Sequence, residues 1–459
     1  MRDWTPRPYQ PPVRQFILDN ARCLVLVPMG GGKTSATLSA IGLLLLLGEV
    51  SKVLVLAPLR VARTTWPTEV SRWADFAHLR VSVICGTEAE RIAALKCDAD
   101  IYTTNYEQLP WLVEHLGAAW PFDMVVADEA TRLKSFRLRQ GGARARALGR
   151  VAHSKVKRFV QLTGTPAPNG LQDLWALAWF CDAGQRLGRT FTAFTDRWFR
   201  QGQDGYSLVP LPHAQAEIQG AIRDVSMSLD MRDWFDLRET RRNTVYVELP
   251  KKARAAYREM EREMFALIAG HEVEAFNAAS RTMKCLQLAN GAAYVDEAAA
   301  QFEVVHDEKL DALESIVEEA GGAPVLCAYH FKSDRARILK RFPDALDVAT
   351  PQGFAKALVG KGRLWIGHPA SMGHGVDGLQ QHCWTAAFFG HWWNLEEHDQ
   401  FVERIGPVRQ AQAGHPDRLV TVHYIVAKGT VDELVMARRD SKRSVQDLLK
   451  EAMKRSTTT

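Results

Sequence analysis

The chain has 459 residues, of which 46% are hydrophobic and 24% are charged. These proportions are typical of soluble globular proteins and exclude a disordered or fibrous chain. Lys and Arg exceed Asp and Glu by 58 to 53, a net charge of +5, which permits an acidic partner without requiring one. The length suits two or three domains.

The sequence lacks the patterns of a membrane span, a zinc site or a disulfide framework. The longest apolar run, residues 41–47 (IGLLLLL), is much shorter than the ~20 residues that a membrane-spanning helix needs. The seven cysteines include no CxxC pair, the histidines include no HExxH motif, and the first residues have no apolar signal-peptide core. We therefore expect a soluble, cytoplasmic protein.

Strands and helices alternate through the first part of the chain. Short apolar runs rich in β-branched residues indicate strands at 23–27, 53–57, 81–85, 101–103 and 124–127. Helical stretches are indicated between them, at 35–47 and 64–76. Continuous apolar strands that alternate with helices are typical of a parallel sheet covered on both faces.

From about residue 180 to residue 291 the pattern is mostly helical, with one strand-like segment at 245–249 (VYVEL). Alternation then resumes, and strands are indicated at 325–328, 363–367 and 386–390. The sequence therefore predicts an α/β fold in which a helical insertion separates two parallel-sheet lobes. We expect a first lobe at residues 1–180 and a second lobe at residues 301–459. Residues 181–300 between them would form a mostly helical inter-lobe protrusion and link.

A glycine-rich motif directly follows the first predicted strand. It comprises Gly30, Gly31, Gly32, Lys33 and Thr34. Glycines let backbone N–H groups surround phosphate oxygens, and the N-terminus of the following helix adds partial positive charge. We expect Lys33 to neutralise the β- and γ-phosphates of ATP and the Thr34 hydroxyl to bind Mg²⁺. Val27 stands where the full motif has Gly or Ala, and a glycine-rich turn that only packs is the alternative.

An acidic pair ends the strand predicted at 124–127. Asp128 in this position is the usual second contact to Mg²⁺, and Glu129 can orient or deprotonate the attacking water. In open α/β sheets, ligands bind at the carboxyl ends of the strands, where both motifs fall. We expect this strand to neighbour the strand that precedes the glycine-rich motif.

These motifs, with others, resemble superfamily 2 helicase-like ATPases of the Swi/Snf type. In the first lobe, residues 8–10 (PYQ) resemble the adenine-reading segment, and residues 57–60 (APLR) and 102–106 (YTTNY) resemble nucleic-acid-contacting motifs. Residues 128–131 (DEAT) stand at the acidic motif, and residues 161–170 (QLTGTPAPNG) resemble the coupling motif. In the second lobe they are 371–380 (SMGHGVDGLQ) and the spacing of Trp393, Asn394, Gln400 and Arg404. The segment 403–410 (ERIGPVRQ) resembles the compact phage-encoded branch. The resemblance implies two RecA-like lobes that use ATP and Mg²⁺.

The resemblance also implies roles for individual residues. It assigns nucleotide contacts to Gln10, Gly375 and Asp377, and coupling roles to Thr163, Gly164, Thr165 and Gln410. It implies nucleic-acid contacts by Arg60, Thr104, His330 and Lys332. Lys134, a basic residue that follows the DEAT segment, and Trp393 are further candidate contacts. Trp392 and Trp393 would stack on bases, although buried aromatic residues beside a strand end more often belong to the core.

Members of the family supply two arginines three positions apart, and an arginine finger is worth 10³–10⁵ in rate. Alignment without gaps places Pro407 where the second arginine belongs, and Arg409 follows two positions later. We therefore assign the finger jointly to Arg404 and Arg409, with a surface arginine as the alternative for either.

A basic stretch follows the DEAT segment. Between Glu129 and Asp173 the chain has no acidic residue but ten basic ones: Arg132, Lys134, Arg137, Arg139, Arg144, Arg146, Arg150, Lys155, Lys157 and Arg158. Such a stretch of one sign predicts a surface that follows nucleic-acid phosphates, and a solvated helix face is the alternative.

Together these features predict a DNA-dependent ATPase motor, that is, an ATP-driven DNA helicase or double-stranded DNA translocase. Its partner would be double-stranded or forked DNA contacted through the backbone, since no helix-turn-helix or zinc-finger spacing appears. One alternative is an RNA-directed helicase of the same superfamily. Another is a nucleotide-gated DNA-binding scaffold with little turnover, which Pro407 and Thr131 suggest.

Overall fold

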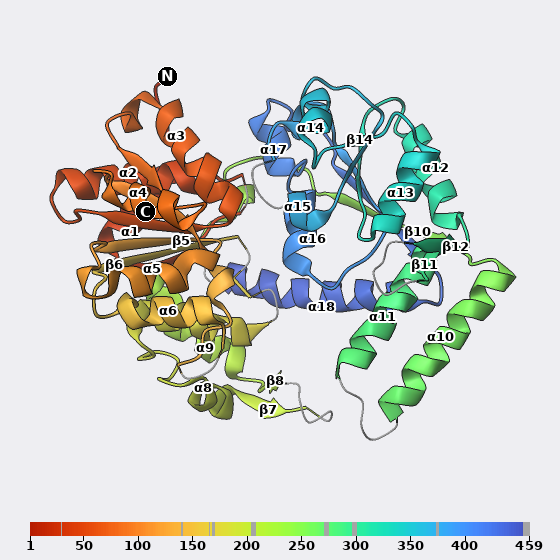
Figure 1. The fold of residues 1–459 in the computed structure, drawn as a ribbon, viewed down its shortest axis with the longest axis horizontal. Helices are drawn as coiled ribbons and strands as arrows, with labels where there is room; N and C mark the ends of the chain where they lie inside the picture. Colours follow the sequence, from red (N-terminus) through yellow and green to blue (C-terminus); the bar gives the residue numbers. More distant parts are fainter. Residues whose placement is uncertain are drawn as a thin grey trace. The chain divides into compact units, whose positions relative to one another are not determined.

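The chain forms two compact units, each built on a parallel sheet (Figure 1). The computed structural model describes residues 1–28, 30–138, 141–164, 166–167, 170–202, 208–269, 275–295, 301–372 and 376–452. The first unit comprises Met1–Trp234 and the residues from Lys442 on, and the second comprises Phe235–Ser441. The predicted fold class of two RecA-like parallel-sheet lobes is confirmed. Within the described ranges, no helix is long and apolar enough to cross a membrane.

The first unit contains a seven-stranded sheet in the order β3-β4-β2-β5-β6-β1-β9, in which every pairing is parallel. Its strands are β1 (Arg22–Leu26), β2 (Val53–Ala57), β3 (Val81–Val83), β4 (Ile101–Asn105), β5 (Met124–Asp128), β6 (Arg158–Thr163) and β9 (Ser226–Ser228). The five strands predicted from apolar runs are all present. β6 and β9 were not predicted as strands.

Helices cover both faces of this sheet. They are α1 (Gln10–Asp19), α2 (Lys33–Leu46), α3 (Trp66–Arg72), α4 (Glu88–Lys96), α5 (Leu109–Leu116), α6 (Ala143–Ala152) and α7 (Leu174–Asp182). On one face α5, α6 and α7 join alternate residues of β1, β2, β5 and β6 in one core. The intervening residues of the central strands, such as Val25 and Val55, are also fully buried. Burial on both faces explains the unbroken apolar runs in the sequence.

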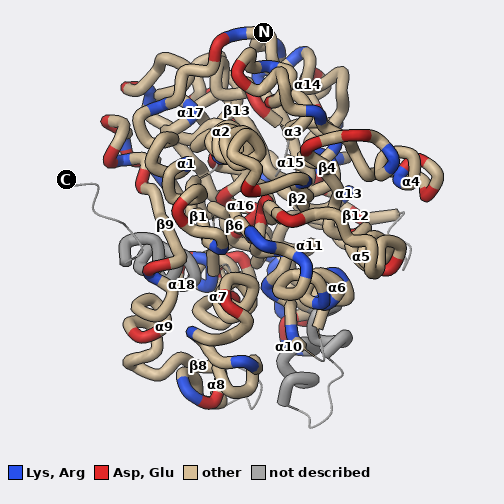
Figure 2. The backbone as a smooth tube through the Cα atoms, turned by 90° about the vertical axis from the view of Figure 1, so that its left-hand side faces the viewer, with Lys and Arg blue, Asp and Glu red and all other residues tan. Residues whose placement is uncertain are grey.

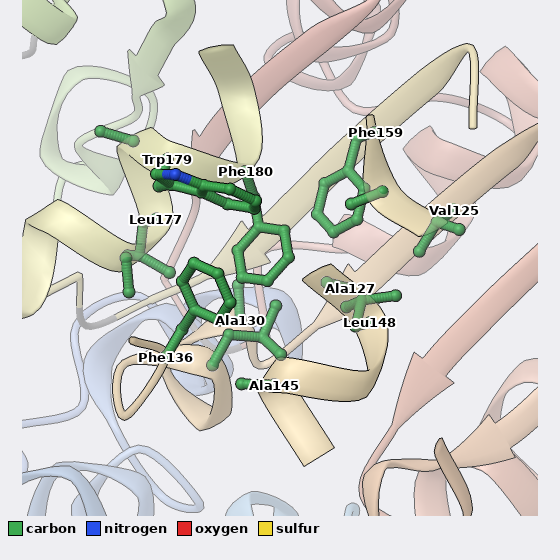
Figure 3. Packing of buried hydrophobic residues seen from close by; sticks show 14 of the residues in the cluster. Val125, Ala127, Ala130, Phe136, Ala145, Leu148, Phe159, Leu177, Trp179 and Phe180 are labelled. Atoms are coloured by element: carbon green, nitrogen blue, oxygen red, sulfur yellow. The ribbon is translucent and has the colours of Figure 1, made fainter. Parts of the chain in front are cut away.

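An aromatic cluster joins the segment after β5 to α7 and the sheet (Figure 3). The ring of Phe136 lies 4.4 Å from that of Trp179 and 5.0 Å from that of Phe180, between ring centroids. Phe180 stacks in turn on Phe159 of β6, at 5.2 Å. A Cβ on Gly149 of α6 would lie only 2.7 Å from the Phe136 ring. Close packing therefore fixes the segment that carries the basic stretch to the sheet beneath it.

The second unit contains a six-stranded sheet in the order β10-β17-β16-β13-β15-β14, also parallel throughout. Its strands are β10 (Arg241–Val247), β13 (Val325–Ala328), β14 (Leu346–Asp347), β15 (Leu364–Gly367), β16 (Thr385–Phe388) and β17 (Thr421–Ala427). Its helices are α10 (Lys251–Ala269), α11 (Ala275–Asn290), α12 (Glu308–Glu319), α13 (Lys332–Arg341), α14 (Pro351–Leu358), α15 (Pro369–Met372), α16 (Leu395–Val402), α17 (Pro407–Gln412) and the start of α18 (Val431–Ala452). The strands predicted at 325–328, 363–367 and 386–390 are present as β13, β15 and β16.

The region predicted as a helical insertion is divided between the two units. The first unit takes α8 (Phe191–Trp198), the hairpin of β7 (Phe199–Gln201) and β8 (Leu208–Pro210), α9 (Ala214–Ile222) and β9. The second takes β10, α10, α11 and the hairpin of β11 (Ala292–Tyr294) and β12 (Phe302–Val304). The strand predicted at 245–249 is β10, which begins four residues earlier, at Arg241. By contacts the chain divides after Trp234, and the three-part division remains a prediction.

Candidate functional site

The glycine-rich motif connects β1 to α2, as predicted. Gly30 and Gly32 adopt positive φ angles of 75° and 68°, a conformation that costs other residues about 1–2 kcal/mol. Gly31 has a different constraint, because a Cβ there would lie 2.4 Å from Cγ1 of Val27. Val27, the residue that departs from the full motif, therefore fills the space that a side chain at position 31 would need. Gly32 is the N-cap of α2, so Lys33 and Thr34 are its first two residues, where backbone N–H groups lack helical partners and can bind phosphate.

Lys33 is largely buried beside the acidic pair. Its Nζ lies 3.9 Å from Oε1 of Glu129, and the two side chains are 11% and 8% exposed. Within the described part of the chain the buried Nζ has no hydrogen-bond partner. A buried ammonium group keeps its charge only where anionic groups compensate for lost hydration. The Nζ of Lys33 can therefore bind further anionic oxygen atoms.

The acidic pair ends β5 with both side chains buried, each 6% exposed. Burial and then the charge of Glu129 raise the pKa of Asp128 from 3.8 to about 6, while Lys33 opposes the rise. Glu129 adopts φ 58° and ψ 56°, a left-handed conformation that is strained for a side chain of this size and is common at functional sites. Two carboxylates and one ammonium group thus share one buried place at the carboxyl edge of the sheet.

The order of the strands at this edge differs from the prediction. We expected β5 to neighbour β1, but β6 lies between them and pairs with both. The prediction was wrong because β6 was not recognised as a strand. The arrangement places the buried Thr163, the last residue of β6, between the two motifs. Gly164 follows it, whereas Thr165 lies outside the described residues.

Gln10 contacts the glycine-rich motif directly. Its Nε2 donates to the carbonyl oxygen of Gly32 at 3.1 Å and to Oγ of Ser35 at 2.9 Å, and its Oε1 accepts from the amide of Arg7 at 2.8 Å. The side chain is only 3% exposed. The first residue of α1 therefore lies at the motif, where the resemblance to the family places the adenine contact.

In the second unit, both candidate finger arginines contact one short segment. Nη1 of Arg404 donates to the carbonyl oxygen of Val376 at 2.7 Å, and Nη1 of Arg409 forms an ion pair with Asp377. The arginines are 3% and 8% exposed, so neither is an ordinary surface arginine. Gly375, the preceding candidate, lies outside the described residues.

Gln410, predicted to couple the lobes, is fully buried within the second unit. Its Nε2 donates to the carbonyl oxygens of Cys383 at 2.8 Å and Ile405 at 3.0 Å, and its Oε1 accepts from Arg418 at 3.1 Å. These bonds give Gln410 a structural function in holding α17 and the segment before it. A coupling function remains a prediction.

The candidate nucleic-acid contacts differ in their accessibility. Arg60 and Lys332 are exposed, and Lys134 and Trp393 are half-buried; Trp393 packs against the core of the second unit. Thr104 is completely buried, and its hydroxyl donates to the carbonyl oxygen of Ile84 at 2.7 Å. Its side chain is therefore unavailable to a nucleic acid in this structure, contrary to the prediction.

His330 is half-buried and its ring packs on Trp392, with centroids 5.6 Å apart. Burial, followed by the neighbouring His368, lowers the pKa of His330 to about 3. The ring is therefore neutral near pH 7 and would contact a phosphate only by a hydrogen bond. The remaining cationic candidate in this part of the second unit is Lys332, at the start of α13.

Only part of the basic stretch is free to act as a surface. Arg158 is buried and binds Glu49 and two main-chain carbonyl oxygens, and Arg137 lies over the ring of Phe191. Arg132 and Arg144 both pair with Glu107, at 3.8 and 2.9 Å. Four more are exposed: Arg146, Arg150, Lys155 and Lys157. Arg139 lies outside the described residues. Figure 2 shows the basic residues along α6 in blue.

Sequence reasoning missed two residues that contact Asp128. Nε1 of Trp66 donates to Oδ2 of Asp128 at 3.0 Å, and the hydroxyl of Tyr106 donates to its carbonyl oxygen at 2.8 Å. Both donors are fully buried. An isolated aromatic residue gives no sign in the sequence of which polar group it will reach. The position of Tyr106 at the end of a family-like segment was the one available signal.

Comparison with known proteins identifies the family. The chain matches the SNF2-related domain over residues 18–291. It is 52% identical to the putative protein p41 of Acyrthosiphon pisum secondary endosymbiont phage 1, over 99% of this chain and all of that protein. It is 30% identical to the mouse DNA excision repair protein ERCC-6-like over 168 residues, 35% of this chain and only 13% of that protein.

Among solved structures, the chain is similar to the Sulfolobus solfataricus SWI2/SNF2 ATPase core in complex with dsDNA. The identity is 21%, the match covers 98% of this chain and 94% of the other, and the TM-score is 0.46. The matched family domain spans more than half of the 459 residues and includes the glycine-rich motif, the acidic pair and the segment around β6. The chain therefore belongs to the SNF2-related family of ATPases.

Proposed function

We propose that the protein is a DNA-dependent ATPase motor that translocates on double-stranded DNA. The observation that carries the proposal is the buried group of Lys33, Asp128 and Glu129 beside the first turn of α2. In a chain of the SNF2-related family, this group supplies the charges that a bound nucleoside triphosphate and its metal ion require. A relative whose name refers to DNA excision repair supports DNA as the partner.

The residues of the first unit fit ATP and Mg²⁺. The buried Nζ of Lys33 has no hydrogen-bond partner within the described chain and would bind the β- and γ-phosphates. Thr34 and Asp128 would hold Mg²⁺ through oxygen atoms, the ligands this ion prefers. When bound, the ion neutralises charge on the transferring phosphoryl group. Gln10 would orient the base, since its side chain is fixed against Gly32 and Ser35.

Glu129 is the residue suited to position the attacking water. Its left-handed backbone conformation turns the chain directly after β5, so that two successive carboxylates remain buried at the same edge. Arg404 and Arg409 would supply charge to the γ-phosphate, and the proposal therefore requires the second unit to act together with the first during turnover. Asp377 and Gly375 would belong to the same part of the nucleotide site.

DNA would be contacted mainly through its phosphates. Arg60 and Lys332 are the exposed candidates within family-like segments, and Lys134 is half-buried. Exposed basic residues of α6 and the turn that follows it add positive charge in the first unit. They are Arg146, Arg150 and Lys155. Phosphate contacts of this kind bind many sequences and weaken steeply with salt.

The test compares ATP hydrolysis with duplex DNA, single-stranded DNA, RNA and no nucleic acid. We expect duplex DNA to stimulate hydrolysis most. Stimulation by RNA alone would favour an RNA-directed helicase instead. Tight DNA binding with hydrolysis no faster than in buffer would indicate a nucleotide-gated scaffold, and either result would refute the proposal.

We expect the dependence on Mg²⁺ to change near pH 6. Because the pKa of Asp128 is about 6, a proton competes with the metal ion below that pH, and the apparent affinity for Mg²⁺ should fall about tenfold per pH unit. Above pH 6 it should be nearly constant. Titrations of Mg²⁺ against ATP hydrolysis, at about pH 5 and pH 7, measure the effect. The same affinity at both values would contradict the assignment of Asp128.

The raised pKa of Asp128 also affects stability in a defined direction. The folded state holds this proton more tightly than the unfolded chain, whose value is the usual 3.8. The stabilising contribution is therefore fully present below that value and is lost as the pH rises through about 6. Binding of a cation at neutral pH would offset this loss.

The assignment of the arginine finger can be tested by exchange for lysine, which keeps the charge. Arg404 bonds to a main-chain carbonyl oxygen, whereas Arg409 is already neutralised by Asp377. We therefore expect Arg404→Lys to lower the DNA-stimulated turnover number by about 10³-fold or more, and Arg409→Lys to lower it less. The measurement is kcat with duplex DNA at saturating ATP. The reverse order would assign the finger to Arg409.

A further inference from the structure

Two segments of the first unit that resemble nucleic-acid-contacting motifs each lead to a hydrogen bond on Asp128. The first segment, 57–60, ends at Arg60, and Trp66 follows six residues later. The second, 102–106, ends at Tyr106. Trp66 donates to the carboxylate of Asp128 at 3.0 Å, and Tyr106 donates to its carbonyl oxygen at 2.8 Å. Asp128 thus receives one bond from the second segment itself and one from Trp66, the first residue of α3, which follows the first segment.

The two bonds are buried and complementary. Trp66 and Tyr106 are both 0% exposed, and Asp128 is 6% exposed, so water does not compete for these acceptors. The indole N–H orients the carboxylate, while the phenol O–H fixes the main chain that carries it. Buried networks in which each bond holds a different part of one residue restrict its position more than either bond alone.

The connection between Arg60 and Trp66 is an unusual turn. Val61–Thr65 form a π-helix, an element that is rare and is frequent at functional sites. The hydroxyl of Thr103 in β4 donates to the carbonyl oxygen of Ala62 at 2.8 Å. A side chain of the second segment therefore holds the turn that leads from the first, and a displacement of either segment would reach Trp66.

From this arrangement we infer that Trp66 and Tyr106 are positioning residues, which transmit DNA contact at the two segments to the metal-binding carboxylate of Asp128. The inference rests on the proposed DNA-dependent ATPase. When DNA binds near Arg60 and Tyr106, the two donors align Asp128 for Mg²⁺, so DNA accelerates hydrolysis by improving the metal site. Without the donors, DNA still binds but no longer aligns the carboxylate.

The test uses Trp66→Phe and Tyr106→Phe, which remove the donors and keep most of the ring volume. Trp120→Phe and Tyr257→Phe are the controls, because these buried residues bond to main-chain groups elsewhere. Nε1 of Trp120 donates to the carbonyl oxygen of Phe122, and the Tyr257 hydroxyl accepts from the amide of Val431. Each variant is measured as the full chain for DNA affinity, for the ratio of DNA-stimulated to basal hydrolysis and for half-saturating Mg²⁺.

We expect Trp66→Phe and Tyr106→Phe each to lower the stimulation ratio and raise half-saturating Mg²⁺ by about tenfold, with DNA affinity within about twofold of wild type. The controls should keep the wild-type ratio. Unchanged ratio and Mg²⁺ dependence in both test variants would overturn the inference, and so would equal losses in the controls. A wild-type protein that DNA does not stimulate would refute the proposed function itself.

Discussion

Replacing Lys33 with alanine is expected to lower ATP hydrolysis by at least about 10²-fold, because one preorganised charge at a reacting group contributes about that much. The Nζ is buried, lies 3.9 Å from Glu129 and lacks a hydrogen bond in the described chain. Lys33 is the first residue of α2, where its charge would neutralise the phosphates. Steady-state hydrolysis with saturating duplex DNA measures the loss, and direct titration measures DNA binding, which should persist.

The control for this variant is Lys157→Ala. Lys157 belongs to the same unit but is 72% exposed, with its Nζ 3.6 Å from Asp123. An exposed pair of this kind contributes little to stability, so hydrolysis should stay near the wild-type rate. If Lys33→Ala hydrolysed ATP as fast as Lys157→Ala, the nucleotide site would have to lie elsewhere in the chain.

The Glu129→Gln variant should bind ATP and DNA but hydrolyse ATP about 10³-fold more slowly, within the range attributed to a positioned general base. Glutamine has nearly the same shape, so the buried turn at φ 58° can be kept. The amide, however, neither accepts a proton from water nor compensates the charge of Lys33. Single-turnover hydrolysis and equilibrium ATP binding, measured separately, distinguish loss of chemistry from loss of binding.

Glu88→Gln is the control for loss of one carboxylate in the first unit. Glu88 lies in the first turn of α4 and accepts a hydrogen bond from Trp111 at 3.1 Å, outside the proposed nucleotide site. We expect no change in turnover. If Glu129→Gln also hydrolysed ATP at the wild-type rate, Glu129 would not be the residue that positions the water.

The sequence was sufficient to predict the framework of the first unit, because buried parallel strands leave unbroken apolar runs. The predicted strands became β1 to β5, and the glycine-rich motif and acidic pair lie at their carboxyl ends. The position of β6 between β5 and β1 was not predicted, because its run from Arg158 to Thr163 mixes apolar with polar residues. Long-range strand order depends on pairing, which a local pattern does not reveal.

Side-chain partners explain the other differences. A stretch with ten basic residues and no acidic residue predicts a charged surface, yet Arg158 and Arg137 use their guanidinium groups to hold the unit together. Thr104 lies in a family-like segment but faces the core. The bond from Trp66 to Asp128 joins residues 62 positions apart. Which polar group a buried side chain reaches depends on tertiary contacts, and such contacts were not available from the sequence.

The most direct test of the account is displacement of a third strand from a DNA triplex, because a motor that moves along duplex DNA removes the strand without separating the duplex. We predict that the wild-type protein displaces the strand in the presence of ATP and Mg²⁺, and that Glu129→Gln, bound to the same DNA, does not. Equal displacement by both proteins, or none by a wild-type protein that hydrolyses ATP with duplex DNA, would contradict translocation driven by this site.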